Sequence, residues 1–396
     1  MKLRIVTHKI VKGDGQGRAN YEIVLEAIRR GYHITLVASQ IAPDLQQHPQ
    51  VTWVALPLRH LPTQLLKDLD FAQRSAAWVQ AHRSTFDRIL VNGAVTWAAG
   101  DINVVHFVHS AWLRSPIHPA RSQRNFYGFY HWVYNKLNAH WERAAFQQAK
   151  VVVAVSEQVQ RELIEIGIAP AKIRVISNGV DLAEFYPGSE STGDRPDMSS
   201  QRNQLGLPPN VPLALFVGDI RLNRKNLDTV LHALTQVPTL HLAVVGTIEG
   251  SPYPRLVEML KLTERVHFLG YRRDVAALMR SVDLFAFPSR YEPFGMVVLE
   301  AMASGLPVIT AKTAGVAALI TPDCGMVLAN PEDAITLAQM LVKLVKDADL
   351  RLQLGQTGRA IAEQHSWASK AQQYLDLLEN LDRNSLTQPS LTIKGR

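Results

Sequence analysis

Two glutamates lie eight residues apart in a segment that is otherwise largely apolar. The segment reads SRYEPFGMVVLEAMASG from Ser289 to Gly305, and its carboxylates are Glu292 and Glu300. A helix that is apolar all round is normally a buried helix. A buried carboxylate is costly unless something hydrogen-bonds to it or pairs with it. No Lys or Arg lies three or four residues from Glu300, so its partner must come from elsewhere in the fold or from a ligand.

Glu292 lies in a loop that leads into the start of this expected helix. Gly295 stands at the helix start, where exposed backbone N–H groups form a natural anion site. One carboxylate beside such a helix start and a second one within the helix indicate a site for a sugar attached to a phosphate. The alternative is a surface Glu292 together with a Glu300 that is bridged to a distant arginine in the core.

This segment resembles a known signature. The spacing Glu292-x7-Glu300 is similar to the E-x7-E motif of retaining glycosyltransferases of the GT-B fold, in particular glycosyltransferase family 4. Other residues of the motif stand in register, namely Pro288, Phe294, Gly295, Gly305 and Pro307. The resemblance runs from the first expected strand to about Leu381.

The resemblance implies an α/β protein with the GT-B fold, in which two doubly wound Rossmann-like domains face an interdomain cleft. It implies a metal-independent, retaining glycosyltransferase (hexosyltransferase class) with no cofactor besides its nucleotide-diphosphate sugar donor. The acceptor would be a hydroxyl of a glycan or lipid-linked molecule, in cell-surface polysaccharide or glycolipid biosynthesis. Two alternatives stay open: a nucleotide-sugar epimerase of the same fold, which needs no acceptor, and a non-catalytic nucleotide-sugar-binding protein.

The resemblance also assigns roles around the two glutamates. Glu300 would accept hydrogen bonds from both ribose hydroxyls of the donor. Glu292 and the N–H groups around Phe294, Gly295 and Met296 would bind the sugar hydroxyls and the distal phosphate. Tyr271 belongs to a strand and loop whose backbone reads the base in this family, so the base itself leaves no side-chain signal.

Two cations are expected to hold the donor diphosphate and to stabilise the charge of the leaving group. They lie in the stretch FVGDIRLNRKNLDTVLHAL that follows a strand. The family position for the arginine is occupied by Asp219, which makes Arg221 the expected substitute. Lys225 matches the family lysine, with Asn226 in place of the following glycine. The alternative is a solvated basic turn.

A glycine-rich stretch and a histidine point to the first domain's share of the cleft. Gly15 and Gly17 follow the first strand and precede a helix, where glycines let the backbone approach a phosphate. A plain loop is the alternative, and a NAD fingerprint is disfavoured because no acid ends the second strand. His109 resembles a strand-end histidine near the donor sugar and acceptor, whereas His106 better suits a satisfied core histidine.

The chain alternates strands with helical patterns, which predicts two parallel sheets with crossover helices. A helix is expected over Ala19–Arg30. The first series of strands comprises Leu3–Thr7, Ile34–Ala38, Val51–Ala55, Arg88–Val91, Val104–Val108 and Val151–Val155. The strand Val151–Val155 is expected to be the last of this series. The second comprises Leu213–Val217, His241–Val245, Arg265–Phe268, Leu284–Pro288 and Pro307–Thr310.

These patterns divide the chain into four parts. An acceptor-side domain over 1–186 precedes a Pro-, Gly- and Ser-rich linker over 187–210. A nucleotide-sugar-binding domain follows over 211–367. The last part, 368–396, is a helix over about Ala368–Leu381 that crosses back to the first domain and then a frayed tail.

Composition indicates an ordinary globular protein: 47% of its 396 residues are apolar and 19% are charged. No signal peptide or membrane-spanning stretch is evident, and the single Cys324 fits a cytoplasmic location. Residues 1–185 hold 21 Lys/Arg and 14 Asp/Glu, a net of +7, whereas residues 186–396 hold 21 of each. The basic first half indicates an anionic partner, such as the inner membrane face or a pyrophosphate-linked acceptor, or merely unselected surface charge. Nucleic acid is not expected, because no binding motif accompanies the charge.

Aromatic and basic residues are interleaved between Trp112 and Arg143. Interfacial membrane helices use this combination, and it also suits a platform for an acceptor sugar. Packing of a large helix on the first domain is the simplest account.

Overall fold

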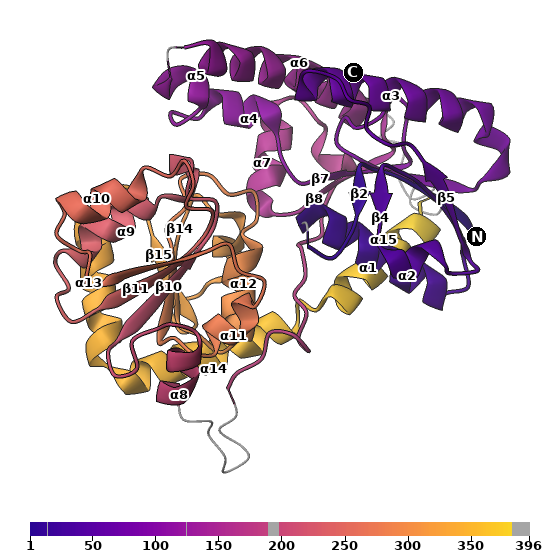
Figure 1. Ribbon diagram of the computed structural model, residues 1–396. Coiled ribbons are helices and arrows are strands. Elements are labelled where there is room, and N and C mark those ends of the chain that lie inside the picture. Colours follow the sequence, from indigo (N-terminus) through magenta and orange to yellow (C-terminus); the bar gives the residue numbers. More distant parts are fainter. Residues whose placement is uncertain (14, 124, 189–197, 382–396) are drawn as a thin grey trace, which may run out of the picture.

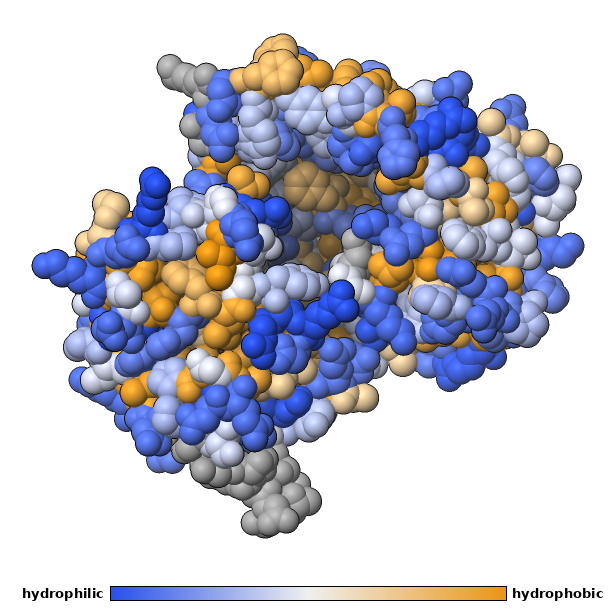
Figure 2. Space-filling view, viewed as in Figure 1, coloured by the Kyte–Doolittle hydropathy of each residue, from blue (hydrophilic) through white to orange (hydrophobic). Residues whose placement is uncertain are grey.

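Two parallel β-sheets packed between helices form two lobes of the protein (Figure 1). The computed structural model describes residues 1–13, 15–123, 125–188 and 198–381. Figure 2 shows a deep hollow between the two lobes. Within the described residues, no helix is both long enough and apolar enough to cross a membrane.

The first sheet has the strand order β5-β3-β1-β6-β7-β8-β9, and neighbouring strands pair in parallel. Its strands are β1 (Lys2–Val6), β3 (His33–Ala38), β5 (Val51–Ala55), β6 (Arg88–Asn92), β7 (Ile102–Val105), β8 (Val151–Ala154) and β9 (Ile173–Val175). The chain winds outward from β1 in one direction and from β6 in the other. Parallel sheets bind ligands at such a reversal of strand order, beyond the carboxyl ends of the strands.

The helices of the first lobe are α1 (Gly15–Arg29), α2 (Pro43–Gln46), α3 (Gln64–Ala81), α4 (His109–Arg114), α5 (Pro119–Ser122), α6 (Phe126–Gln148) and α7 (Glu157–Glu165). A small separate sheet pairs β2 (Lys9–Ile10) with β4 (Gln40–Ile41). The helix α1 starts at Gly15, four residues earlier than expected. The glycine-rich stretch is therefore partly the first turn of this helix and not a loop that precedes it.

The second sheet has the order β12-β11-β10-β13-β14-β15, also parallel. Its strands are β10 (Leu213–Val217), β11 (His241–Val245), β12 (Val266–Gly270), β13 (Leu284–Phe287), β14 (Val308–Ala311) and β15 (Gly325–Leu328). Its helices are α8 (Met198–Gln204), α9 (Leu227–Leu234), α10 (Tyr253–Met259), α11 (Val275–Met279), α12 (Met296–Ala303), α13 (Ala334–Lys346) and α14 (Ala348–Glu363). The order reverses between β10 and β13, so the loops after these two strands lie side by side.

The expected doubly wound α/β architecture is confirmed, and every expected strand is present. The first series does not end at β8, however, because β9 adds an edge strand of three residues. Likewise β15 extends the second sheet. The strand β9 was missed because it is short and exposes Arg174 and Val175, and so lacks an apolar run.

The segment 187–210, expected to be a linker, contains helix α8 and one buried arginine. Arg202 is 3% exposed and pairs with Asp283 at 2.9 Å. It also donates to the carbonyls of Ser281 and Val211, both at 2.8 Å. These bonds fix α8 to the second sheet. Residues 189–197 of the expected linker and 382–396 of the expected tail lie outside the described residues.

The last helix, α15 (Trp367–Glu379), returns to the first lobe and packs along α1 (Figure 1). Its apolar face is buried, with Tyr374 at 2% and Leu375 and Leu378 at 0% exposure. Arg30 of the first lobe pairs with Asp376 at 2.7 Å and also with Glu379. The helix is thus part of the first lobe's surface, although it ends the described chain.

Candidate active site

The loop before α12 is shaped by a glycine in the left-handed region. Gly295 has φ 101° and is the residue that precedes the helix. A Cβ at this position would lie 3.2 Å from Val316 and 3.3 Å from Glu292. Phe294 is 3% exposed and anchors the loop in the core. The positive φ and these close contacts therefore favour a residue without a side chain, and the first N–H groups of α12 have no partners within the helix.

Lys225 and Glu292 meet at the point where the strand order of the second sheet reverses. They come from the loops after β10 and β13, and the Lys225 ammonium forms an ion pair with the Glu292 carboxylate. The two side chains are 16% and 13% exposed. The guanidinium of Arg224 lies 4.0 Å from the same carboxylate. Burial alone would raise the pKa of Glu292, but the charges of Lys225 and Arg224 outweigh it and hold that pKa below its ordinary value.

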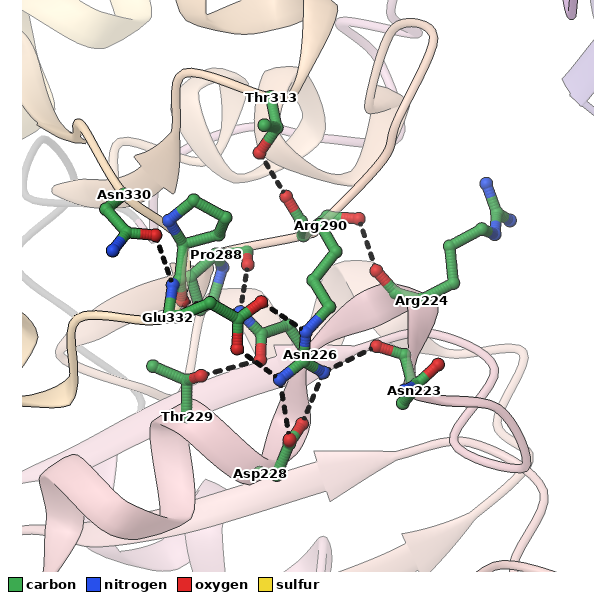
Figure 3. Close-up of polar contacts among 12 residues, drawn as sticks. Asn223, Arg224, Asn226, Asp228, Thr229, Pro288, Arg290, Thr313, Asn330 and Glu332 are labelled. Carbon is green, nitrogen blue, oxygen red and sulfur yellow. Dashed lines mark hydrogen bonds and ion pairs between the residues drawn. The ribbon is translucent and has the colours of Figure 1, made fainter. Parts of the chain in front are cut away.

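A network of polar contacts holds the two loops together (Figure 3). Arg290 pairs with Asp228 at 2.7 Å and with Glu332 at 2.6 Å. Its backbone N–H donates to the carbonyl of Arg224 at 2.9 Å. The side chain of Arg224 extends away from this network (Figure 3). The network thus fixes the backbone of the two loops from which Arg224, Lys225 and Glu292 come.

Asn226 replaces the expected glycine and keeps its backbone conformation, with φ 66°. Asparagine tolerates this left-handed region better than most residues. Its side chain, which a glycine would lack, donates to the carbonyls of Pro288 at 2.8 Å and Pro331 at 2.6 Å. Asn226 is completely buried. The substitution therefore preserves the turn that aims Lys225 and adds two bonds between loops.

Glu300 has no hydrogen-bond or ion-pair partner for its carboxylate among the residues the structure describes. The sequence indicated a helix that is buried on all sides. In the structure Met296, Val297 and Glu300 of α12 are partly exposed. Burial raises the pKa of Glu300 to about 7, the charge of Glu184 adds to this, and Arg18 opposes it. A distant core arginine does not pair with it: Arg18 is engaged by Glu22 and Asp181 at 2.7 and 2.8 Å. The carboxylate thus retains its full capacity to accept hydrogen bonds.

The first lobe approaches this helix closely. A Cβ on Gly15 would lie 3.3 Å from the sulfur of Met296, which brings two of the expected donor-binding residues together across the hollow. Other contacts join the lobes nearby: the Ser156 hydroxyl donates to the carbonyl of Pro293 at 2.6 Å. The ring of Tyr291 lies edge-on to that of Phe107, with centroids 5.6 Å apart. The candidate site is therefore bounded by both lobes.

His109 lies in a cavity of about 240 Å³ in the first lobe, at the carboxyl ends of β1, β6 and β7. It is the first residue of α4 and not part of a strand, because β7 ends at Val105. The Glu142 carboxylate accepts the backbone N–H groups of His109 at 3.0 Å and Ser110 at 3.2 Å and so starts the helix. The His109 ring contacts Asn135 through Nδ1 at 2.7 Å, and burial lowers its pKa.

The remaining expected site residues are less closely associated. Arg221 is 53% exposed, and its guanidinium pairs with Asp219 at 2.8 Å. Tyr271 is 72% exposed in the loop after β12. Gly17 lies in the first turn of α1. The structure thus brings together Lys225, Glu292 and the start of α12, while the roles of Arg221 and Tyr271 remain predictions.

Two side chains near the site were not expected from the sequence. Arg224 could have been found from its position beside Lys225 in a basic pair. Asp68, which lines the cavity of His109, had no signal, because it lies in helix α3 without any motif. Among the described residues, no group of three or more His, Cys, Asp or Glu side chains could hold a metal ion.

Two protein-family models match the chain. The model described as Glycosyltransferase Family 4 matches residues 13–184, and the model described as Glycosyl transferases group 1 matches residues 197–361. One match covers most of the first lobe and the other most of the second. The chain therefore carries both halves of the two-lobed arrangement that the sequence resemblance implied.

Curated relatives with the name D-inositol 3-phosphate glycosyltransferase are similar to the chain. The protein from Xylanimonas cellulosilytica is 31% identical over 245 residues, which are 60% of this chain and 58% of the relative. The chain thus spans somewhat more than half of that relative's length. The protein from Mycobacterium leprae strain TN is 29% identical over 393 residues, which are 90% of this chain and 86% of the relative.

Solved structures share the two-lobed arrangement. Sucrose-phosphate synthase from Thermosynechococcus elongatus has a TM-score of 0.77 at 21% identity and covers 97% of this chain and 99% of its own. Anabaena HepE in complex with UDP-glucose has a TM-score of 0.72 at 22% identity and covers 96% of this chain and 100% of its own. At these identities the likeness shows a common fold alone.

Proposed function

Because the chain belongs to glycosyltransferase family 4 and has the GT-B fold, we propose that it transfers a sugar from a nucleotide-diphosphate sugar to a hydroxyl of an acceptor. The observation that carries this proposal is the meeting of Lys225 and Glu292 beside the start of α12. Glu300 lies about one turn into the same helix, four residues after Met296, with an unpaired carboxylate. Structural neighbours include a complex with UDP-glucose, which supports a nucleotide sugar as donor.

The cations of the loop after β10 would bind the donor diphosphate. Lys225 and Arg224 both lie near the same oxygen of the Glu292 carboxylate, and the start of α12 adds backbone N–H donors. Together they would stabilise the negative charge that the leaving diphosphate develops as the bond to the sugar breaks. Arg221 would join them only by leaving Asp219.

The two glutamates would bind the neutral parts of the donor. Glu292 is ionised, which suits it to accept hydrogen bonds from hydroxyls of the sugar being transferred. Glu300 would accept from the ribose hydroxyls, which are the partners its carboxylate lacks. Gly15 lies against Met296 on the opposite side, so the donor would be enclosed by both lobes and shielded from water.

We also propose that the sugar keeps its anomeric configuration and that no metal ion is needed. Retention is the expectation of the family resemblance, with the leaving phosphate as the group that takes the acceptor proton. Metal independence is supported by the two cations and the helix start, which already supply positive charge at the diphosphate. Several relatives are named for D-inositol 3-phosphate, so we propose a sugar or cyclitol hydroxyl as acceptor.

A thermal-shift panel of UDP-, GDP- and ADP-sugars in EDTA tests the donor assignment. A ligand at ~100 times its dissociation constant adds ~2.7 kcal/mol of stability. We expect one base to stabilise the wild type, and Lys225→Met to lose most of that shift. Met259→Ser, at the exposed last residue of α10, is the control. A panel without any shift would remove the basis of the proposal.

The first lobe also carries an apolar face that suits a membrane surface. Phe126, Phe129 and Trp132 of α6 are 83%, 60% and 42% exposed, and their spacing places them on one side of the helix. The ammonium of Lys136 lies 4.9 Å from the Trp132 ring centre. Figure 2 shows apolar residues gathered along the top of this lobe, over α6. Aromatic side chains beside basic ones bind interfaces of anionic lipid.

We therefore propose that the enzyme works in the cytoplasm in peripheral contact with an anionic membrane, where glycolipid or cell-surface glycan precursors would be its acceptors. Co-sedimentation with vesicles of phosphatidylglycerol and phosphatidylcholine measures this contact. The double substitution Phe129→Ser with Trp132→Ser should reduce binding to the anionic vesicles, while Met259→Ser should not. Equal binding to pure phosphatidylcholine, or no effect of the double substitution, would contradict the proposal.

A further inference from the structure

The cavity that contains His109 lies next to the candidate donor site but is separate from it. Phe107, which lines the cavity, contacts Tyr291, the neighbour of Glu292. Its volume of about 240 Å³ is smaller than the ~300–1,000 Å³ of a typical small-molecule pocket. It therefore suits a single ring and not a whole acceptor molecule.

The cavity has an acidic lining although the first lobe is basic. Asp68 contributes a carboxylate, and Glu142 contributes a carboxyl group that accepts from the start of α4 and whose pKa burial raises to about 7. None of the described lining residues is Lys or Arg. Burial lowers the pKa of both His8 and His109, so these rings are neutral at pH 7. Lys9, the residue after His8, is exposed and does not line the cavity. A phosphate placed here would face the Asp68 carboxylate, with no cation among the described lining residues, in a site of low dielectric.

The same lining is well suited to hydroxyl groups. Asp68 is held by the Gln64 amide at 2.7 Å and by the Tyr134 hydroxyl at 2.9 Å. A carboxylate offers about four acceptor positions, so at least one remains for a ligand hydroxyl. The Nδ1 atom of His8 is buried without a hydrogen-bond partner among the described residues. Buried polar atoms without partners are uncommon and often belong to ligand sites.

We propose that this cavity receives the acceptor through an uncharged, polyhydroxylated ring, and that Asp68 excludes rings that carry a phosphate. The inference rests on the proposed function, since it concerns the acceptor of the same reaction. Such a ring differs from the compound in the names of the curated relatives, D-inositol 3-phosphate, which is a phosphate ester. Any anionic part of the acceptor, such as a lipid phosphate, would lie outside the cavity along the basic surface of the lobe.

Acceptor-dependent release of nucleoside diphosphate tests this inference. The donor is the nucleotide sugar that stabilises the protein in the panel above. The acceptors are myo-inositol, glucose and N-acetylglucosamine, each paired with its monophosphate. We expect kcat/KM to be at least tenfold higher for the neutral member of the best pair. Asp68→Asn should reduce that preference at least fivefold, because it removes the charge and keeps an oxygen for Tyr134.

Asp70→Asn is the matched control, because Asp70 lies on the same helix but pairs with Arg59 and Arg74 and does not line the cavity. It should leave the preference unchanged. Higher turnover with the phosphorylated rings, or no stimulation by any neutral ring while the donor binds, would overturn the inference and leave the proposed function standing. Absence of donor binding would instead refute the proposed function.

Discussion

Replacing Glu300 with glutamine should change the response of the protein to pH in two opposite ways. In the free protein, the buried carboxyl group has a pKa raised from 4.5 to about 7. Between these values the folded protein holds a proton that the unfolded chain releases, so the folded state loses stability as the pH rises through this window. At ~1.36 kcal/mol per pKa unit the loss reaches about 3 kcal/mol. Water in the open hollow reduces this, and we expect about 1–3 kcal/mol.

Nucleotide binding should have the opposite dependence on pH. Hydrogen bonds from ribose hydroxyls favour the ionised carboxylate and lower its pKa in the complex. The affinity for a nucleotide sugar should therefore increase about tenfold from pH 6 to pH 8, because a group with a pKa near 7 must lose its proton on binding. A nucleotide sugar is the right probe, since its substituted diphosphate has no group that titrates in this range.

The assay measures melting temperature and nucleotide-sugar affinity at pH 5.5, 6.5, 7.5 and 8.5 with UDP-glucose, GDP-mannose and ADP-glucose. Glu300→Gln should melt a few degrees above the wild type at pH 8.5 without ligand, and its affinity should be lower and independent of pH. Glu363→Gln, at an exposed carboxylate that pairs with Arg359, is the control. If Glu300→Gln and the wild type show the same pH profile of affinity, the ribose role of Glu300 is wrong.

Three further substitutions have expected outcomes. Arg202→Ala removes a buried guanidinium from the partly exposed Asp283 and from the carbonyls of Ser281 and Val211, so urea unfolding should show a loss of about 3 kcal/mol with little change in nucleotide affinity of the protein that remains folded. Gly295→Ala forces a side chain against Val316 at a φ of 101°; the expected loss is about 1–3 kcal/mol, together with weaker nucleotide binding by calorimetry. Lys225→Met should reduce kcat/KM about 100-fold or more, as for other groups that stabilise a developing charge, while the circular dichroism spectrum stays unchanged.

The architecture and the core of the donor site were predictable because they follow from local patterns. Alternating strands and helices predicted parallel sheets, and loops after neighbouring strands of such a sheet must meet at one edge. Lys225 and Glu292 are found together for this reason. Their positions depend only on which strands precede them, and the apolar runs of β10 and β13 are unmistakable in the sequence.

The choice between arginines was not predictable in the same way. Arg221 and Arg224 are close together in one loop, and the sequence does not indicate which of the two side chains points toward Glu292. In the structure Arg221 pairs with Asp219. Asn226 adopts a left-handed backbone conformation two residues after Arg224, and the Arg224 guanidinium lies near Glu292. Asp68 escaped prediction because it reaches its cavity only through the packing of α3 beside α6, which brings it to Tyr134.

The return of α15 to the first lobe has a consequence for the order in which the protein is completed during synthesis. The first lobe leaves the ribosome without the helix that covers α1, and this helix follows only after the entire second lobe. Until then the side of α1 that packs against α15 is uncovered, and newly made chains are exposed to association or chaperone binding at that surface. A first lobe expressed alone should therefore aggregate, and a separate peptide of residues 366–381 should restore its solubility.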